Sequence, residues 1–229
     1  MKKALLILSI LFISMSYGQE VKQVPQINVS GEGKVKVIPD QATITVTVET
    51  KGNNAKEVKK QNDEKIDAVL KFIKKMNVAP SDYKTQRVSL NPQYDYEKKK
   101  HNYNATQTIE ILLRDLSKYD ELMEGLVDQG INRIDAVTFQ SSKLAQYQSE
   151  ARKLAMKEAK MKAEDYVSVL GQKVGRAMTI SDNSQTYYPQ PVYATMKSME
   201  SSDTAQPRET LAAGEINITA NVTVSFILE

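Results

Sequence analysis

Two runs of alternating apolar and polar residues open the patterned part of the chain. Residues 27–37 and residues 42–49 repeat with the period of two that is typical of a half-buried β-strand. Gly31 and Gly33 interrupt the first run, and glycines inside a strand pattern favour a bulge or a sharp bend. This glycine pair is followed by a strand and not by a helix, so it does not match the phosphate-binding loops of Rossmann or P-loop folds.

Between residues 41 and 140 the pattern changes repeatedly between strand and helix periods. A helical period over 54–76 carries Asn62 on its apolar face, where the buried amide is expected to bond to the backbone of a neighbouring loop. The other elements predicted here are a hairpin with a polar tip over 88–113, a short helix over 117–127 and a strand over 133–139. The order β-α-β-β-α-β is that of the ferredoxin-like plait, a four-stranded antiparallel sheet with both helices on one face.

The elements outside this plait predict a second layer. A long helix over 144–170 carries small residues spaced four apart, which permit close approach to a sheet, and other apolar residues widen this stripe. The small residues are Ala151, Ala155, Ala159 and Ala163, Val167 continues their spacing, and the widening ones are Leu154, Met161, Tyr166 and Leu170. A short strand over 177–180, a long loop over 181–214 and a closing strand over 216–228 follow. The predicted fold class is α+β: the 41–140 plait, and a second layer from 26–39 with 141–229.

The N-terminus predicts export from the cytoplasm. Lys2 and Lys3 precede an apolar run over 4–15, which is the length of a signal peptide and short for a membrane span. Small residues then favour a cut before Gln19, giving a signal peptide over 1–18 and a mature chain over 19–229. No second apolar stretch is long enough to span a membrane. Without the two signal lysines, 29 of the 31 basic residues remain against 28 acidic ones, which argues against bulk binding of nucleic acid.

Composition removes most kinds of enzyme that can be recognised from sequence. The chain has no Cys and one His, so thiolate metal sites, cysteine nucleophiles and His-based metal centres are not expected. His101 follows a run of lysines at the predicted hairpin tip, where a solvated turn is the simpler interpretation. These charges are flanked by Tyr94, Tyr96 and Tyr103, so a small anion-binding patch is the alternative interpretation. We therefore predict no catalytic, cofactor-binding or metal-ligating residue and no cofactor.

Several motifs, in this order and spacing, resemble those of the SIMPL-domain family over roughly residues 25–229. They are Ile27–Gly33, Pro39–Ala42, Asn62, Tyr83–Thr85, Leu90–Tyr94, Gly130–Asn132, Ala151–Ala163, Leu170–Gly171 and Gly214–Ile216. The family includes YggE-like periplasmic proteins and the outer-membrane immunogenic protein of Brucella. The resemblance implies a two-part α+β fold, export in bacteria, assembly into large ring-like or channel-like oligomers, and an association with defence against oxidative stress. It implies no catalytic residue.

The sequence and the resemblance together lead to one expected function and one alternative. We expect an exported, non-enzymatic envelope protein, in the periplasm or associated with the outer membrane, that forms homo-oligomers and acts in oxidative or envelope stress. The alternative is a periplasmic binding or adaptor module for a small molecule or an envelope protein. Its contacts would come from the tyrosine-rich loop at 187–193 or from the hairpin at 94–103.

Overall fold

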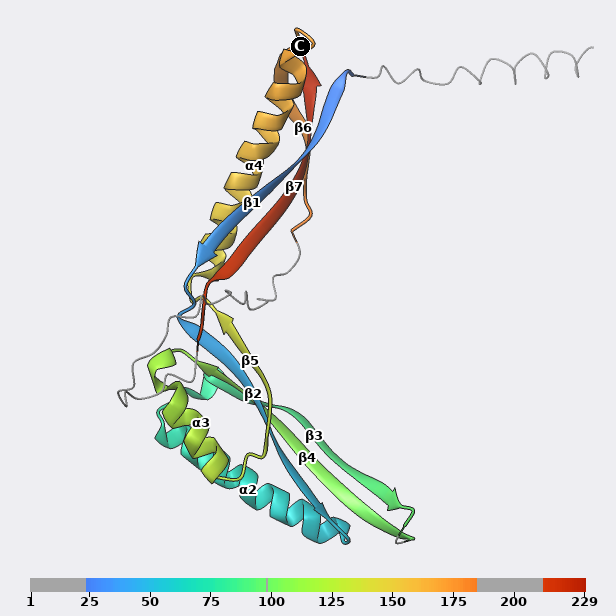
Figure 1. Ribbon diagram of the computed structural model, residues 1–229, viewed down its shortest axis with the longest axis vertical. Helices are drawn as coiled ribbons and strands as arrows, with labels where there is room; N and C mark the ends of the chain where they lie inside the picture. Colours follow the sequence, from blue (N-terminus) through green and yellow to red (C-terminus); the bar gives the residue numbers. More distant parts are fainter. Residues whose placement is uncertain (1–23, 98, 185–211) are drawn as a thin grey trace, which may run out of the picture.

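The computed structural model describes residues 24–97, 99–184 and 212–229. Two antiparallel sheets follow one another along the molecule, one carrying helix α4 and the other carrying helices α2 and α3 (Figure 1). The strands are β1 Gln26–Val37, β2 Gln41–Gly52, β3 Tyr83–Asp95, β4 Lys100–Leu113, β5 Arg133–Gln140, β6 Val174–Asp182 and β7 Ile216–Leu228. The helices are α2 Ala55–Lys75, α3 Tyr119–Asp128 and α4 Leu144–Ser168, with short 3-10 turns at Pro80–Asp82 and Leu116–Lys118. The α+β class is confirmed.

The first sheet has the order β3-β4-β2-β5, and all its neighbours are antiparallel. Its core lies between the sheet and the two helices, where alternate residues of β2 and β4 meet the apolar faces of α2 and α3. The most deeply buried members are Ile44, Val46, Val48, Val69, Ile73, Ile109, Ile111, Leu122 and Leu126. Val127, the apolar residue next to Leu126 on α3, is 53% exposed because it lies past the edge of this contact.

Asn62 reaches strands and not the loop that the sequence predicted. Its side-chain amide donates to the carbonyl oxygens of Val48 at 3.1 Å and Ala105 at 3.3 Å and to the Thr50 hydroxyl at 3.2 Å. Because Val48 belongs to β2 and Ala105 to β4, this one buried side chain ties α2 to two neighbouring strands.

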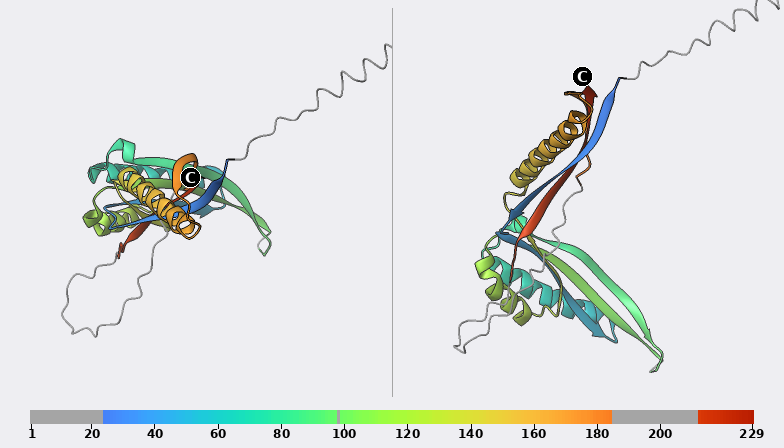
Figure 2. Two further views of the ribbon diagram at one scale, coloured as in Figure 1. Left: turned by 90° about the horizontal axis from the view of Figure 1, so that it is seen from above. Right: turned by 45° about the horizontal axis from the view of Figure 1, so that its top comes forward.

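The second sheet has the order β1-β7-β6, with α4 packed across β1 and β7 (Figure 2). The predicted bulge at Gly31 and Gly33 is wrong, since β1 pairs with β7 from Gln26 to Val37 without a register shift. A Cβ built at Gly31 would overlap the Ala155 carbonyl oxygen of α4, and one at Gly33 would overlap the Ala151 carbonyl oxygen. The glycines are therefore required by the close approach of helix and strand.

The apolar stripe of α4 is narrower than the sequence predicted. Ala151, Ala155, Ala159, Ala163 and Val167 are buried against the sheet, as expected. Leu154, Met161, Tyr166 and Leu170 are exposed, because a helix whose backbone lies so close to the strands touches them only along its central ridge. The short strand predicted at 177–180 is the middle of β6.

Asp40 joins the two chain segments that cross between the sheets. Its carboxylate accepts hydrogen bonds from the Ser142 backbone N–H at 2.7 Å and from the Ser142 hydroxyl at 2.5 Å. The Ser142 hydroxyl, more than any other contact, lowers the pKa of Asp40 below its usual value. Asp40 lies between β1 and β2, and Ser142 lies between β5 and α4, so the two crossings are held side by side. That residues 41–140 and residues 26–39 with 141–229 form two subdomains of one domain stays a prediction.

Candidate functional site

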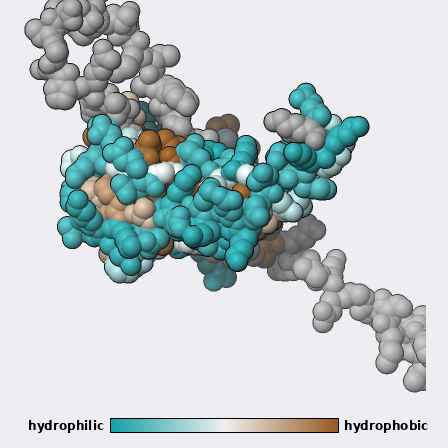
Figure 3. All heavy atoms as spheres, turned by 90° about the horizontal axis from the view of Figure 1, so that it is seen from below, coloured by the Kyte–Doolittle hydropathy of each residue, from teal (hydrophilic) through white to brown (hydrophobic). Residues whose placement is uncertain are grey.

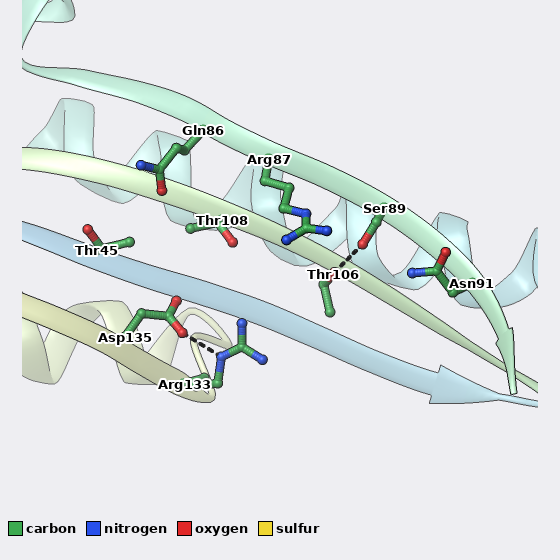
Figure 4. A pocket seen from close by; sticks show the side chains of 9 residues that line it. All are labelled: Thr45, Gln86, Arg87, Ser89, Asn91, Thr106, Thr108, Arg133 and Asp135. Atoms are coloured by element: carbon green, nitrogen blue, oxygen red, sulfur yellow. Dashed lines mark hydrogen bonds and ion pairs between the residues drawn. The ribbon is translucent and has the colours of Figure 1, made fainter.

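A groove crosses the face of the first sheet that carries no helix (Figure 4). Its volume is about 660 Å³, and all four strands of the sheet contribute to it. Every lining residue is polar: Thr45, Gln86, Arg87, Ser89, Asn91, Thr106, Thr108, Arg133 and Asp135. We call this feature the outer groove.

The polar floor of the outer groove follows from the alternation of the strands. Ile44, Val46 and Val48 face the helices, so Thr45 and Thr47 point to the opposite side of β2. The register places Thr47 opposite Thr108 of β4, and their hydroxyl oxygens are 2.8 Å apart. The two side chains are buried within a face that has no apolar core above it, and because the Thr47 hydroxyl donates to Asp135, Thr108 is the donor in their shared hydrogen bond.

Arg133 enters the outer groove from β5 with its charge balanced. Its Nε donates to Asp135 Oδ1 at 2.7 Å, and its Nη1 lies 3.7 Å from Glu49 Oε2. Asp135 also accepts from the Thr47 hydroxyl at 2.5 Å. The pKa of Glu49 is lowered first by its hydrogen bond from Lys51 and then by Asn104 and Arg133, so this carboxylate stays ionised beside the groove.

Arg87 enters from β3 and has no such balance. No hydrogen bond or ion pair involves its side chain among the residues that the structure describes. Figure 4 shows its guanidinium reaching over β4 towards the middle of the groove, while Arg133 reaches in from the other side. With Arg133 paired to Asp135, Arg87 leaves the groove with one uncompensated positive charge.

A bulge in β3 decides the direction of Arg87. Thr85 pairs with Ile109 of β4, and Arg87 pairs with Thr108. Between these two pairs β3 moves on by two residues and β4 by only one, so β3 contains one extra residue. The extra residue reverses the faces of everything after it. Without the bulge Arg87 would point with Thr85 and Ile109 to the helix side; with it, Arg87 faces the groove.

The same bulge turns apolar side chains of β3 to the helix side, where no helix covers them. Helix α2 packs over β2 and β4, while β3 lies at the edge of the sheet. Val88 is therefore 58% exposed, Leu90 38% and Tyr94 41%, with exposed Pro92 between them. We call Val88, Leu90, Pro92 and Tyr94 the β3 strip. Seen from the end that carries this sheet, the described surface is mostly hydrophilic, with apolar residues in small separate areas (Figure 3).

The sequence-predicted hairpin patch is partly assembled. Tyr94 makes edge-on contacts with Tyr96 and with His101, with ring centres 5.0 Å apart in both pairs. Tyr103 lies further along β4, opposite Pro92. Within the described residues no three His, Cys, Asp or Glu side chains are grouped so that they could hold a metal ion.

Two sequence predictions fall outside the described residues: the signal peptide at 1–18 and the tyrosine-rich part of the 181–214 loop. No helix in the described part of the chain is long and apolar enough to cross a membrane. The outer groove was not predicted as a site, although the alternation of Thr43, Thr45 and Thr47 already indicated a polar sheet face.

Comparison with known proteins identifies the family. The profile of SIMPL, described as a protein of unknown function (DUF541), matches residues 27–226. This chain belongs to the SIMPL family. It is 30% identical over 213 residues to the uncharacterized protein YggE of Escherichia coli K12, covering 92% of this chain and 86% of the relative.

A second relative also gives the compartment. The chain is 27% identical over 220 residues to the 26 kDa periplasmic immunogenic protein of Brucella melitensis, covering 91% of this chain and 86% of that protein. The predicted periplasmic localisation is confirmed by this relationship. The uncharacterized YggE of Edwardsiella ictaluri is 27% identical over 197 residues, covering 83% of this chain and 82% of the relative.

Proposed function

We propose that this SIMPL-family chain is a non-enzymatic periplasmic protein that assembles with copies of itself and contributes to defence against oxidative or envelope stress. The observation that carries the assembly is the β3 strip. It combines apolar side chains with the outward-facing backbone groups of an edge strand, in which Pro92 is the one position of the strip that has no N–H to donate. Such edges pair readily with another strand unless they are blocked.

The β1 edge supports this interpretation by contrast, because it is blocked. The Glu158 carboxylate of α4 accepts from the backbone N–H of Glu32, and the Lys162 ammonium donates to the Ser30 carbonyl oxygen at 3.1 Å. Glu158 and Lys162 also pair with each other at 3.0 Å. The hydrogen bond from Glu32 is the main reason that the pKa of Glu158 is lowered. Two charged side chains therefore occupy backbone groups that another strand would need.

A second open edge lies on the other sheet. Strand β6 is its edge strand, and Met178 and Ile180 on it are exposed because α4 is centred over β1 and β7. A chain with two different open edges, here β3 and β6, can associate head to tail, and such contacts form rings when the rotation closes. Closed assembly would protect both edges from uncontrolled aggregation.

Light scattering on the mature protein tests the assembly. We expect a mass of several chains at micromolar concentration, and a lower mass for Val88→Lys, which puts a charge on the β3 strip. Val127→Lys is the matched control, since Val127 is 53% exposed against 58% for Val88 but belongs to helix α3 and not to a strand. A monomeric wild type, or a Val88→Lys protein of unchanged mass, would contradict the proposal.

The stress role rests on the family resemblance. The proposal of a non-enzymatic action rests on two other observations: the sequence contains no Cys, and its one His packs against Tyr94. A strain lacking the gene should be more sensitive to hydrogen peroxide. The wild-type gene should restore resistance, and the Val88→Lys gene should restore less of it if assembly is needed. Equal sensitivity of the deletion strain and its parent would count against the role.

The outer groove supports a second candidate, a periplasmic binding module for a small molecule. Its unpaired Arg87 and its hydroxyl-lined floor form a concave polar surface of ligand size. This candidate is compatible with assembly, because the groove and the β3 strip lie on opposite faces of the same strand.

A further inference from the structure

We propose that the outer groove binds a small hydroxylated molecule through a carboxylate or phosphate group held by Arg87. The inference rests on the second candidate function proposed above, for which it names the ligand class, and it depends on side chains other than those of the assembly. It rests on three features of the groove: its charge, its hydrogen-bonding groups and its size.

The charge of the groove favours an anion. Arg133 and Asp135 neutralise each other at 2.7 Å, and Arg87 has no partner among the described residues. A guanidinium presents paired N–H donors in a plane that fits the two oxygens of a carboxylate or phosphate. The hydrogen bond from Thr47 to Asp135 holds the Asp135 carboxylate near β2, leaving Arg87 as the group that meets an incoming anion.

The neighbours of Arg87 suit the rest of such a molecule. The Ser89 and Thr106 hydroxyls share one hydrogen bond, with their oxygens 2.5 Å apart, and each keeps lone pairs that can accept from a ligand hydroxyl. Asn91 adds an amide with donors and an acceptor at the same side of the groove (Figure 4). Hydroxyls and an amide without any apolar wall favour a ligand rich in hydroxyl groups over an aromatic or aliphatic one.

The size and openness of the groove set the scale of binding. About 660 Å³ would accommodate one or two sugar units. The groove is open to water, so the interaction of one exposed guanidinium is screened, and we expect millimolar affinity.

Titration of the isotope-labelled protein with glucuronate, glucose 6-phosphate and glucose, followed by amide NMR, tests the inference. These probes share a sugar ring and differ in the anionic group, which is a carboxylate, a phosphate or absent. We expect saturable shifts at residues 86–91 and 106–108 with at least one of the two anions and a much weaker effect of glucose. The anion with the higher affinity shows whether Arg87 prefers a carboxylate or a phosphate.

Two substitutions separate Arg87 from general charge effects. Arg87→Gln should weaken binding about tenfold or more, because it removes charge-assisted hydrogen bonds. Arg176→Gln is the matched control, since Arg176 is also exposed and without a described partner but lies on β6 in the other sheet. It should bind as the wild type does.

A third substitution should act in the opposite direction. Asp135→Asn removes the negative charge from the groove and retains an acceptor for Thr47, so anion binding should become several-fold tighter. No saturable shift with either anion, equal binding of glucose and glucuronate, or unchanged affinity in Arg87→Gln would overturn the inference. None of these results depends on the mass measured by light scattering.

Discussion

Replacing Gly31 with alanine should separate α4 from β1. The added Cβ would overlap the Ala155 carbonyl oxygen and lie 2.7 Å from the Ala159 backbone nitrogen. Both are backbone atoms of a 25-residue helix, so neither can move without moving the helix. Ordinary contact begins at 3.4 Å, so α4 must retreat by about 0.7 Å from Ala159 alone and by more at Ala155.

The cost of this movement is set by the buried ridge of α4. A gap of about 0.5–1 Å removes a quarter to a half of the dispersion energy of each atom pair across it. Five buried residues of α4 share the interface, so we expect a loss of about 3 kcal/mol, at the upper end of overpacking effects. In a chain of this length that corresponds to a melting temperature lower by roughly 6–12 °C.

Thermal and urea unfolding measure the loss, and hydrogen exchange locates it. Amides of β1, β7 and α4 should lose protection, while those of β2 and β4 should retain it. Gly175→Ala is the control, because Gly175 lies in the same sheet and the nearest atoms to its added Cβ belong to the flexible Glu229 side chain. This variant should be unchanged or slightly more stable. Equal stability of the Gly31→Ala and Gly175→Ala proteins would refute the close-approach argument.

Three further predictions concern other parts of the chain. Asn62→Ala should cost about 1–3 kcal/mol in urea unfolding by removing the buried hydrogen bonds that join α2 to β2 and β4, whereas Gln61→Ala, an exposed change on the same helix, should have little effect. Arg114 lowers the pKa of Asp82 through hydrogen bonds of 2.6 and 2.7 Å. The stability due to this carboxylate is complete above its unfolded pKa, near 3.8, and is lost as the pH falls through the lowered pKa of the folded state. The free energy of unfolding of Asp82→Asn should therefore differ most from that of the wild type above about pH 4 and converge with it in acid. Unfolding curves at several pH values will show this. Mature protein from the envelope should begin at Gln19 on N-terminal sequencing, and recovery of Met1 would contradict cleavage.

The candidate site depends on an irregularity that periodicity does not reveal. Alternation places Val88 and Leu90 on one side of β3 and Ser89 and Asn91 on the other, but it does not say which side faces the helices. The bulge before Arg87 decides that, and it is visible only in the pairing with β4. Reading β3 as a regular strand from Thr85 would put Arg87 beside the core and leave the outer groove without its free charge.

Local pattern was sufficient for the elements of this protein. The period of two or 3.6 residues, the glycines at helix ends and the four-residue spacing of alanines in α4 determined the α+β class, the order of the elements and the buried ridge. These features depend on residues near one another in the chain, so the sequence alone contains them.

Tertiary structure alone decided how much of each apolar face is covered. The sequence pattern predicts a bulge at Gly31 and Gly33, whereas the structure shows that these glycines let α4 approach β1 closely. The pattern also predicts that Met161 and Tyr166 are buried, but they are exposed because only the central ridge of α4 touches the sheet. Val88 is apolar and alternates correctly, yet it is exposed because α2 lies over other strands. Coverage depends on which distant segments meet and at what distance, and this information belongs to the packed chain and not to any local pattern.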